Sequence, residues 1–168
     1  VFDKLNAKTR EMTTNDIATG MLVFLRARVL IVANCGDSRA LLVSNDAVAV
    51  VSTDHVAKDV RLARLSLAAP MMNDVLEVTH AIGDMRLNPL GQNEPEMFTR
   101  TIDEGTRFLV VANVAVFGAL SNEEVATIVR KFAGSPPASI AARVRGAVQL
   151  RRPAANAAVA IVALDRLN

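Results

Sequence analysis

Few side chains in this sequence of 168 residues could carry out chemistry. Cys35 is its only cysteine, and His55 and His80 are its only histidines. One thiol excludes an internal disulfide, and one thiol with two imidazoles is too small a set for a structural zinc site. Because Cys35 lies between two apolar stretches, we expect a buried, unreactive thiol.

Neither histidine has sequence neighbours that would make it part of a catalytic pair. His55 follows Asp54, a residue type that often precedes a helix, so we expect His55 in the first turn of a helix without a chemical role. No serine or cysteine that could act as a nucleophile lies close to His80 in the sequence. We expect His80 to be a polar residue with locally satisfied hydrogen bonds, and a general base is the remoter alternative.

A local basic group lies near the end of the last long helix that the sequence predicts. It consists of Arg143, Arg145, Arg151 and Arg152. The simpler interpretation is a solvated helix end whose charge complements the helix dipole. The sharper one is contact with an anion, carried by RNA, a phospholipid or an acidic protein. The net charge of +2 and the absence of Tyr and Trp argue against a base-stacking surface.

The elements that would position these residues begin with strands. A short amphipathic helix is expected over residues 1–12. Apolar runs separated by turns then predict strands at Met21–Leu25, Val29–Ala33, Arg39–Val43 and Ala47–Val51. Further strand-like runs follow at Val75–Val78, Phe98–Ile102, Phe108–Val111 and Ala157–Leu164. We expect Ala115–Phe117 to continue the strand that begins at Phe108.

Three longer helices are expected. Asp54 opens one that extends to about Leu67. Ser121 and Glu124 form a capping box for a helix over Asn122–Phe132, and a third spans Pro137–Leu150. Antiparallel hairpins interleaved with a few helices predict the α+β class, an antiparallel β-sandwich flanked by helices.

Six segments, taken in order, resemble the metal-dependent protein phosphatases of the 2C type. They are LIVANCGDSRALLV (30–43), STDH (52–55), VTHAIGDMRL (78–87), QNEPEM (92–97), FLVVANVAVFGALSNEEV (108–125) and PAANAAVAIVAL (153–164). The resemblance implies two antiparallel sheets packed face to face, with a helix pair outside each. It also implies one domain over residues 1–168 that lacks the family's N-terminal strands. Asp37 and Arg39 would brace a turn, and His80 stands where the family usually has Arg.

The same resemblance bears on catalysis. Family members hold two or more Mg²⁺ or Mn²⁺ ions between aspartates, and these ions activate a water for attack on a phosphoester. Val114 stands where a metal-binding Asp is expected in the family's Ser-Asp-Gly turn, and Ala155 replaces the Asp of its Asp-Asn pair. Asp84 is the only retained carboxylate of the metal site, and we expect it to cap its turn rather than bind one weak cation. The resemblance therefore implies no metal, no cofactor and no catalytic residue.

Three functions remain open on this basis. The leading one is a catalytically inactive, pseudophosphatase-like scaffold, a structural or protein-binding subunit of a larger complex. The alternatives are a fragment of an active Mg/Mn-dependent serine/threonine phosphatase and a phosphoprotein-binding module. The apolar runs Val29–Ala33 and Phe108–Phe117 favour the first, because residues 1–20 look too polar to cover them and a partner or a preceding segment would have to.

The sequence also limits the cellular setting. No uncharged run reaches the roughly 18 apolar residues of a membrane-spanning helix, and no signal peptide is visible. We expect an intracellular, non-secreted chain. A cleaved organellar leader is the alternative, because the first residue is Val rather than Met.

Overall fold

The computed structural model describes residues 1–11, 18–56, 78–83 and 94–164. Its helices and strands follow the chain in this order: α1 (Phe2–Glu11), β1 (Gly20–Arg26), β2 (Val29–Cys35), β3 (Arg39–Ser44), β4 (Val48–Val50), β5 (Glu96–Thr101), β6 (Thr106–Ala112), α3 (Val114–Phe117), α4 (Asn122–Lys131), α5 (Pro137–Arg151) and β7 (Val159–Ala163).

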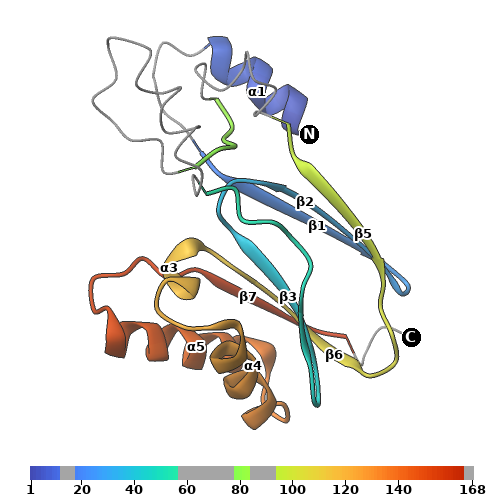
Figure 1. Cartoon of the computed structure of the whole chain (residues 1–168), viewed down its shortest axis with the longest axis vertical. Coiled ribbons are helices and arrows are strands. Elements are labelled where there is room, and N and C mark those ends of the chain that lie inside the picture. Colours follow the sequence, from blue (N-terminus) through green and yellow to red (C-terminus); the bar gives the residue numbers. More distant parts are fainter. Residues whose placement is uncertain (12–17, 57–77, 84–93, 165–168) are drawn as a thin grey trace.

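These strands form two antiparallel sheets. Their orders are β1-β2-β5 in the three-stranded sheet and β4-β3-β6-β7 in the four-stranded sheet. Figure 1 shows the two sheets stacked, with α4 and α5 against the outer side of the four-stranded sheet and α1 beyond one end of the other. The α+β sandwich expected from the sequence is confirmed, and its strands agree with the apolar runs to within about two residues.

Alternating side chains of the central strand β6 pack on opposite faces of the four-stranded sheet. Phe108 and Val110 pack with residues of α4 and α5 such as Val129 and Val144, all buried. Leu109 points to the opposite face, where it joins Leu30 and other residues of a core between the sheets. This period of two is what a strand buried on both faces requires.

The expectation that two apolar runs need cover from elsewhere is wrong for most of their length. Leu30 and Val32 in β2 and Val110 in β6 are almost fully buried within the chain. Phe2 of α1 packs with Ala33 and Cys35 at one end of β2, although the first residues looked too polar to cover anything. What remains open is the outer face of the three-stranded sheet, where the exposed apolar residues are Leu22, Phe24, Val29 and Met97.

Two expected elements differ from the structure. Residues 115–117 belong to the short helix α3 and not to a strand, because a turn of helix buries Val116 and closes backbone bonds such as Gly118 N–H to the Val114 carbonyl, 2.8 Å. Asp54 and His55 do not begin a helix, because their side chains bind Arg39 and Glu96 instead. The rest of that predicted helix lies outside the described residues.

The predicted strand Val75–Val78 lies mostly outside the described residues as well. Its last residue, Val78, makes one isolated antiparallel bridge with Val56. A second isolated bridge joins Ala18 and Ile82. Within the described part of the chain, no helix combines the length and the apolar character that crossing a bilayer requires.

Candidate functional site

Three strand ends meet at one end of the four-stranded sheet. Arg39 at the start of β3 lies opposite Ala112 at the end of β6, and Ala112 lies opposite Val159 at the start of β7. The segments that adjoin these residues carry the positions that the family resemblance marks as important. This end of the sheet is therefore the candidate site.

Asn113 ties together the two segments in which the family resemblance implies metal ligands. Its side-chain amide donates to the Asn156 carbonyl at 2.7 Å, and its side-chain oxygen accepts from the Ala158 N–H at 3.1 Å. Its backbone N–H also donates to the Ala158 carbonyl, 3.2 Å. Because of these bonds, Asn113 precedes α3 without a side-chain cap. Val114 and Ala155, far apart in the sequence, are thereby brought to the same end of the sheet.

Neither of these two positions offers a metal ligand. Val114 is the first residue of α3 and is 46% exposed. Ala155 packs at the margin of the core beneath α5. Hard divalent cations bind oxygen ligands, and side chains of Val and Ala have none, so these residues do not fit the metal centre that the family implies. Asp84, the third position, lies outside the described residues.

In the described ranges, no group of three or more His, Cys, Asp or Glu side chains is arranged to hold a metal ion. The strands β1 and β2, with the sequences GMLVFLR and VLIVANC, contain no Asp or Glu.

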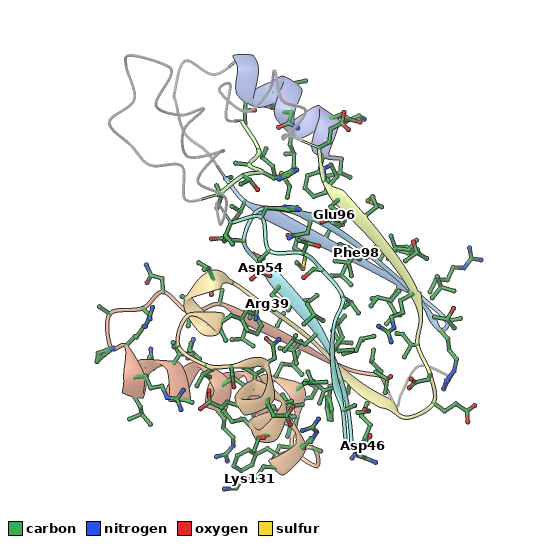
Figure 2. All side chains as sticks on the ribbon, in the orientation of Figure 1. Arg39, Asp46, Asp54, Glu96, Phe98 and Lys131 are labelled. Atoms are coloured by element: carbon green, nitrogen blue, oxygen red, sulfur yellow. The ribbon has the colours of Figure 1, made fainter. Side chains whose placement is uncertain are left out.

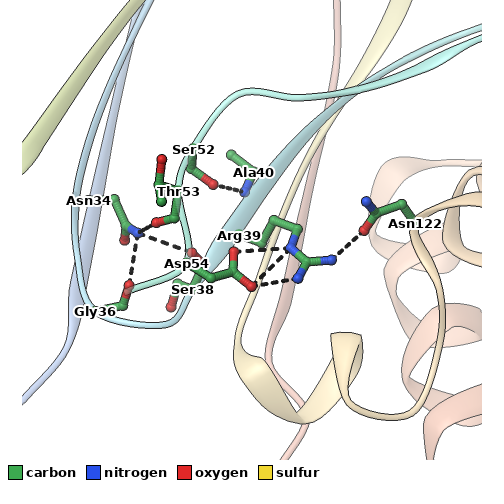
Figure 3. A network of polar contacts seen from close by, with 9 residues as sticks. All are labelled: Asn34, Gly36, Ser38, Arg39, Ala40, Ser52, Thr53, Asp54 and Asn122. Atoms are coloured by element: carbon green, nitrogen blue, oxygen red, sulfur yellow. Dashed lines mark hydrogen bonds and ion pairs between the residues drawn. The ribbon is translucent and has the colours of Figure 1, made fainter. Parts of the chain in front are cut away.

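The neighbouring start of β3 carries an ion-pair network instead (Figure 3). The Arg39 guanidinium donates to both carboxylate oxygens of Asp54, from Nε at 3.1 and 3.2 Å and from Nη2 at 2.5 Å. Its Nη1 donates to the side-chain oxygen of Asn122 at 2.6 Å, and its Cζ atom lies 4.5 Å from the centre of the Phe117 ring. Arg39 thus joins β3, the loop after β4, α3 and α4.

Figure 2 labels Arg39 and Asp54 near the α3 end of the four-stranded sheet, and Glu96 and Phe98 on β5 of the other sheet. The bracing role expected for Arg39 is confirmed. Asp37, from the same motif, is partly buried and makes no hydrogen bond to any described residue. A charge-balanced pair of this kind positions the backbone segments that it joins.

Asn34 closes the turn between β2 and β3. Its side-chain amide nitrogen lies 3.0, 3.2 and 2.8 Å from the carbonyls of Gly36, Ser38 and Thr53 (Figure 3). The residue is fully buried, and its side-chain oxygen has no partner among the described atoms. A polar residue in an otherwise apolar strand was the only sequence signal for this clamp, since a buried amide needs partners.

His55 and His80 form a stacked pair near Glu96. The rings lie 4.0 Å apart at 30°. Nδ1 of His55 accepts from the Gly36 N–H at 3.1 Å, so Nε2 carries the proton that faces the Glu96 carboxylate, also at 3.1 Å. Burial and the neighbouring His55 lower the pKa of His80, and Glu96 opposes that shift. Hydrogen bonds thus hold both rings in place, His55 between Gly36 and Glu96 and His80 against Thr79.

His80 agrees with the expectation of local satisfaction, because its Nδ1 lies 3.1 Å from the Thr79 hydroxyl. The contact between His55 and Glu96 spans 41 residues and had no local sequence signal. Cys35 is fully buried, and burial raises the pKa of its thiol to about 11. The thiol is therefore kept protonated, as expected.

The four arginines near the end of α5 do not form one free basic group. Arg143 stacks on the Phe132 ring at 3.9 Å. Arg151 binds both carboxylate oxygens of Glu124, at 3.1 and 2.5 Å, and the Ala119 carbonyl at 2.8 Å. Arg152 lies close over Gly118. Arg145 is exposed on α5. Two of these side chains, Arg143 and Arg151, therefore have interaction partners within the chain.

Comparison with known proteins agrees with this geometry. A family model described as "Protein phosphatase 2C" matches residues 2–157. "Probable protein phosphatase 2C 9" of Arabidopsis thaliana is 31% identical over 118 residues, which cover 65% of this chain and 42% of that protein. "Protein phosphatase 2C homolog 1" of Schizosaccharomyces pombe is 30% identical over 154 residues, or 83% of this chain and 44% of that one. The chain spans less than half the length of these relatives.

Solved structures show the same fold. A sex-determining protein of C. elegans aligns with a TM-score of 0.80 and 20% identity, covering 97% of this chain and 44% of that one. A serine/threonine phosphatase of S. agalactiae aligns with a TM-score of 0.74 and 22% identity, covering 95% and 66%. Together with the family match over nearly all residues, these findings show that the chain belongs to the protein phosphatase 2C family.

Proposed function

We propose that this phosphatase 2C-like domain has no phosphatase activity and acts as a structural or protein-binding subunit of a larger assembly. The observation that carries the proposal is the chemistry of the candidate site. Asn113 brings Val114 and Ala155 to one end of the sheet, and neither side chain can bind Mg²⁺ or Mn²⁺.

Physical chemistry gives these replacements a consequence beyond the loss of ligands. Clustered carboxylates repel one another when no cation is bound, so an empty metal site destabilises the fold around it. A neutral amide and small apolar side chains at the same place remove that repulsion. The domain can then keep its fold at any metal concentration, which suits a structural role.

The alternative is a fragment of an active Mg/Mn-dependent serine/threonine phosphatase. It is favoured by the short span of the chain, which covers 42% of one curated relative and 28% of another. Under this alternative, the catalytic N-terminal part would lie in residues outside this sequence. It meets the difficulty that Val114 and Ala155 are inside the sequence and would remain in any longer protein.

A phosphatase assay separates the two. The chain is incubated with Mn²⁺ and either p-nitrophenyl phosphate or a phosphoserine peptide, alone and with the acidic N-terminal segment of a 2C-type relative. We expect no chelator-sensitive turnover in either case. Mn²⁺-dependent turnover that the added segment brings about would overturn the proposal in favour of the fragment.

Thermal unfolding provides a second test. We expect millimolar Mg²⁺ or Mn²⁺ to leave the melting temperature unchanged, whereas specific binding at a hundred times the dissociation constant would add about 2.7 kcal/mol to stability. A shift of several degrees that Asp84→Ala abolishes would show a working cation site. The subunit role is tested by size exclusion of native extract, where migration of the protein by itself would contradict it.

A further inference from the structure

The two histidines of the sequence are stacked where residues 78–83 meet the loop after β4. Their ring centres lie 4.0 Å apart, and the ring planes are inclined by 30°. His55 belongs to the loop and is buried, whereas His80 belongs to the segment 78–83 and is partly buried. The proposed function uses neither ring. Because the ordinary pKa of histidine is 6.5, this contact contains groups that can change their charge in mild acid.

Few backbone bonds hold the segment 78–83 against the loop. Val78 makes one isolated bridge to the loop, and the Thr79 N–H donates to the His55 carbonyl at 2.8 Å. The N–H at the other end of the segment donates separately to the side chain of Asn6 in α1, 3.2 Å. A contact made by so few backbone bonds opens at a lower free energy than a strand inside a sheet.

The backbone around His55 fits the neutral ring. Nδ1 accepts from the Gly36 N–H at 3.1 Å, and a proton on that nitrogen would turn the acceptor into a second donor. The Gly36 peptide is not free to turn away, because its carbonyl accepts from the His55 N–H and from the Asn34 amide, both at 3.0 Å. A charged His55 therefore loses this hydrogen bond.

One carboxylate faces the pair and acts in the opposite direction. Glu96 of β5 lies 3.1 Å from Nε2 of His55, and it raises the pKa of His80. Burial lowers the pKa of His80 more strongly, and the neighbouring His55 lowers it as well. A single carboxylate cannot balance two positive charges on rings that lie 4.0 Å apart.

Other titratable groups lie on the neighbouring described segments. Asp54 is bound to Arg39, and Asp37 lies in the turn before β3. None of these three is among the causes that shift the pKa of His80. The Cys35 thiol at the end of β2 keeps its proton, because burial raises its pKa to about 11. Among the described residues, the charge of the contact thus depends on the two rings and the β5 carboxylate.

We propose that mild acid opens the contact between residues 78–83 and the loop after β4, with His55 and His80 as its pH-sensitive pair. The closed form keeps His55 neutral so that it can accept from Gly36, whereas both rings of the open form take up protons from water. Because the open form binds more protons, a fall in pH favours it. The segment then keeps its bond to α1 and loses those to the loop.

The sign for His80 is the same. Its folded-state pKa is lowered from 6.5, so the stabilisation of the closed form is present above pH 6.5 and is lost as the pH falls from there towards the folded-state value. The inference goes beyond the proposed function and does not depend on it, because its test reads local opening and not binding or turnover.

NMR of the 168-residue chain between about pH 7.5 and about pH 5.5 is the experiment. Opening is read as the hydrogen-exchange protection of the Thr79 N–H, corrected for the intrinsic pH dependence of exchange, with the Val110 N–H of β6 as internal control. We expect protection at Thr79 to fall at least about fivefold and protection at Val110 to stay constant. The ring-proton signal of His80 should titrate below pH 6.5.

Two variants assign the effect to the pair. His80→Phe keeps a stacked ring that takes up no proton, so the fall in protection at Thr79 should shrink to less than about twofold. Glu96→Gln keeps an acceptor for His55 and removes the charge that favours protonated rings, so opening in acid should increase. Glu104→Gln, at an exposed carboxylate in the turn after β5, is the matched control and should leave opening unchanged.

Three results would overturn the proposal. They are protection at Thr79 that does not change with pH, a fall that His80→Phe leaves in full, and a fall shared equally by Val110, which would be global unfolding. If His80→Phe does not fold, Glu96→Gln decides, because its substitution lies on a partly exposed side chain. Opening in acid that Glu96→Gln leaves unchanged or reduces would then contradict the assignment to the histidine pair.

Discussion

Two junctions lie at the same end of the four-stranded sheet, and different kinds of interaction hold them together. At the start of β3, Asn122 extends the charged pair Arg39–Asp54. Across the end of β6 and the start of β7, Asn113 joins the strands through neutral hydrogen bonds, and Val114 and Ala155 stand where the family resemblance implies aspartates. One junction is thus stabilised by a charged pair and the other by neutral hydrogen bonds.

Breaking the Arg39 junction should have the largest effect. Arg39→Ala leaves Asp54, whose side chain is 16% exposed, without its bidentate partner, and removes the bond to Asn122. Charged hydrogen bonds of this kind contribute about 1.5–3 kcal/mol, and partial exposure reduces the cost of the unpaired charge. We expect a loss of about 2–3 kcal/mol in urea unfolding.

Arg100→Ala on the exposed edge strand β5 is the control and should change stability by less than about 0.5 kcal/mol. Asp54→Ala completes a double-mutant cycle. If the effects of Arg39→Ala and Asp54→Ala simply add, the two side chains are not coupled, and the contrast between the junctions loses its basis.

A smaller, pH-dependent effect is expected at the start of α4. Ser121 and Glu124 form the predicted capping box, and bonds from Arg151 and Ser121 lower the pKa of Glu124 to about 2 from its usual 4.5. Because the folded-state pKa is the lower one, the stabilisation is present above pH 4.5 and is lost as the pH falls towards 2. The melting temperature of wild type should exceed that of Glu124→Gln near neutrality, and the gap should close in acid.

The control for this measurement removes the other partner. In an Arg151→Met background, most of the pH dependence of the gap should disappear, since Arg151 is the largest cause of the shift. A gap that stays constant between neutral pH and pH 2 would show that the ion pair does not act in solution. Ser121→Ala should cost about 1 kcal/mol through loss of the cap.

The smallest effect is expected at the position of a lost ligand. Val114 is half-exposed at the first position of α3, where a carboxylate is compatible with the helix N-terminus. We expect Val114→Asp to change the free energy of unfolding by less than about 0.5 kcal/mol, with or without Mn²⁺. A loss above 2 kcal/mol that Mn²⁺ restores would mean that other carboxylates surround this position, and the two junctions would then be alike.

Patterns that act over a few residues were read correctly from the sequence. The alternating and continuous apolar runs predicted β1, β2, β3, β6 and β7, because burial of one or both faces leaves a period that survives in the sequence. The capping box at Ser121 and the proline start of α5 also act locally. The order of the six motifs was enough to identify the family.

The predictions that failed share one physical cause. A residue's local interaction competes with contacts to residues that are distant in the sequence, and the distant contacts prevail. Asp54 looked like a helix cap, but a bidentate arginine from β3 is a stronger partner than a free backbone N–H. Residues 115–117 looked like a strand, but a turn of helix buries Val116 beneath the layer of α4 and α5. The apolar runs of β2 and β6 looked uncovered because helices and sheets that bury them come from elsewhere in the chain.

The sequence by itself determined the fold class and the family, because side-chain type and local periodicity can be read residue by residue. Only the tertiary structure decided that Asn113 brings Val114 and Ala155 to the same end of the sheet and that Arg39 joins four segments. Each of these depends on which segments meet after folding, and pairing between residues tens of positions apart leaves no periodic trace in a single sequence.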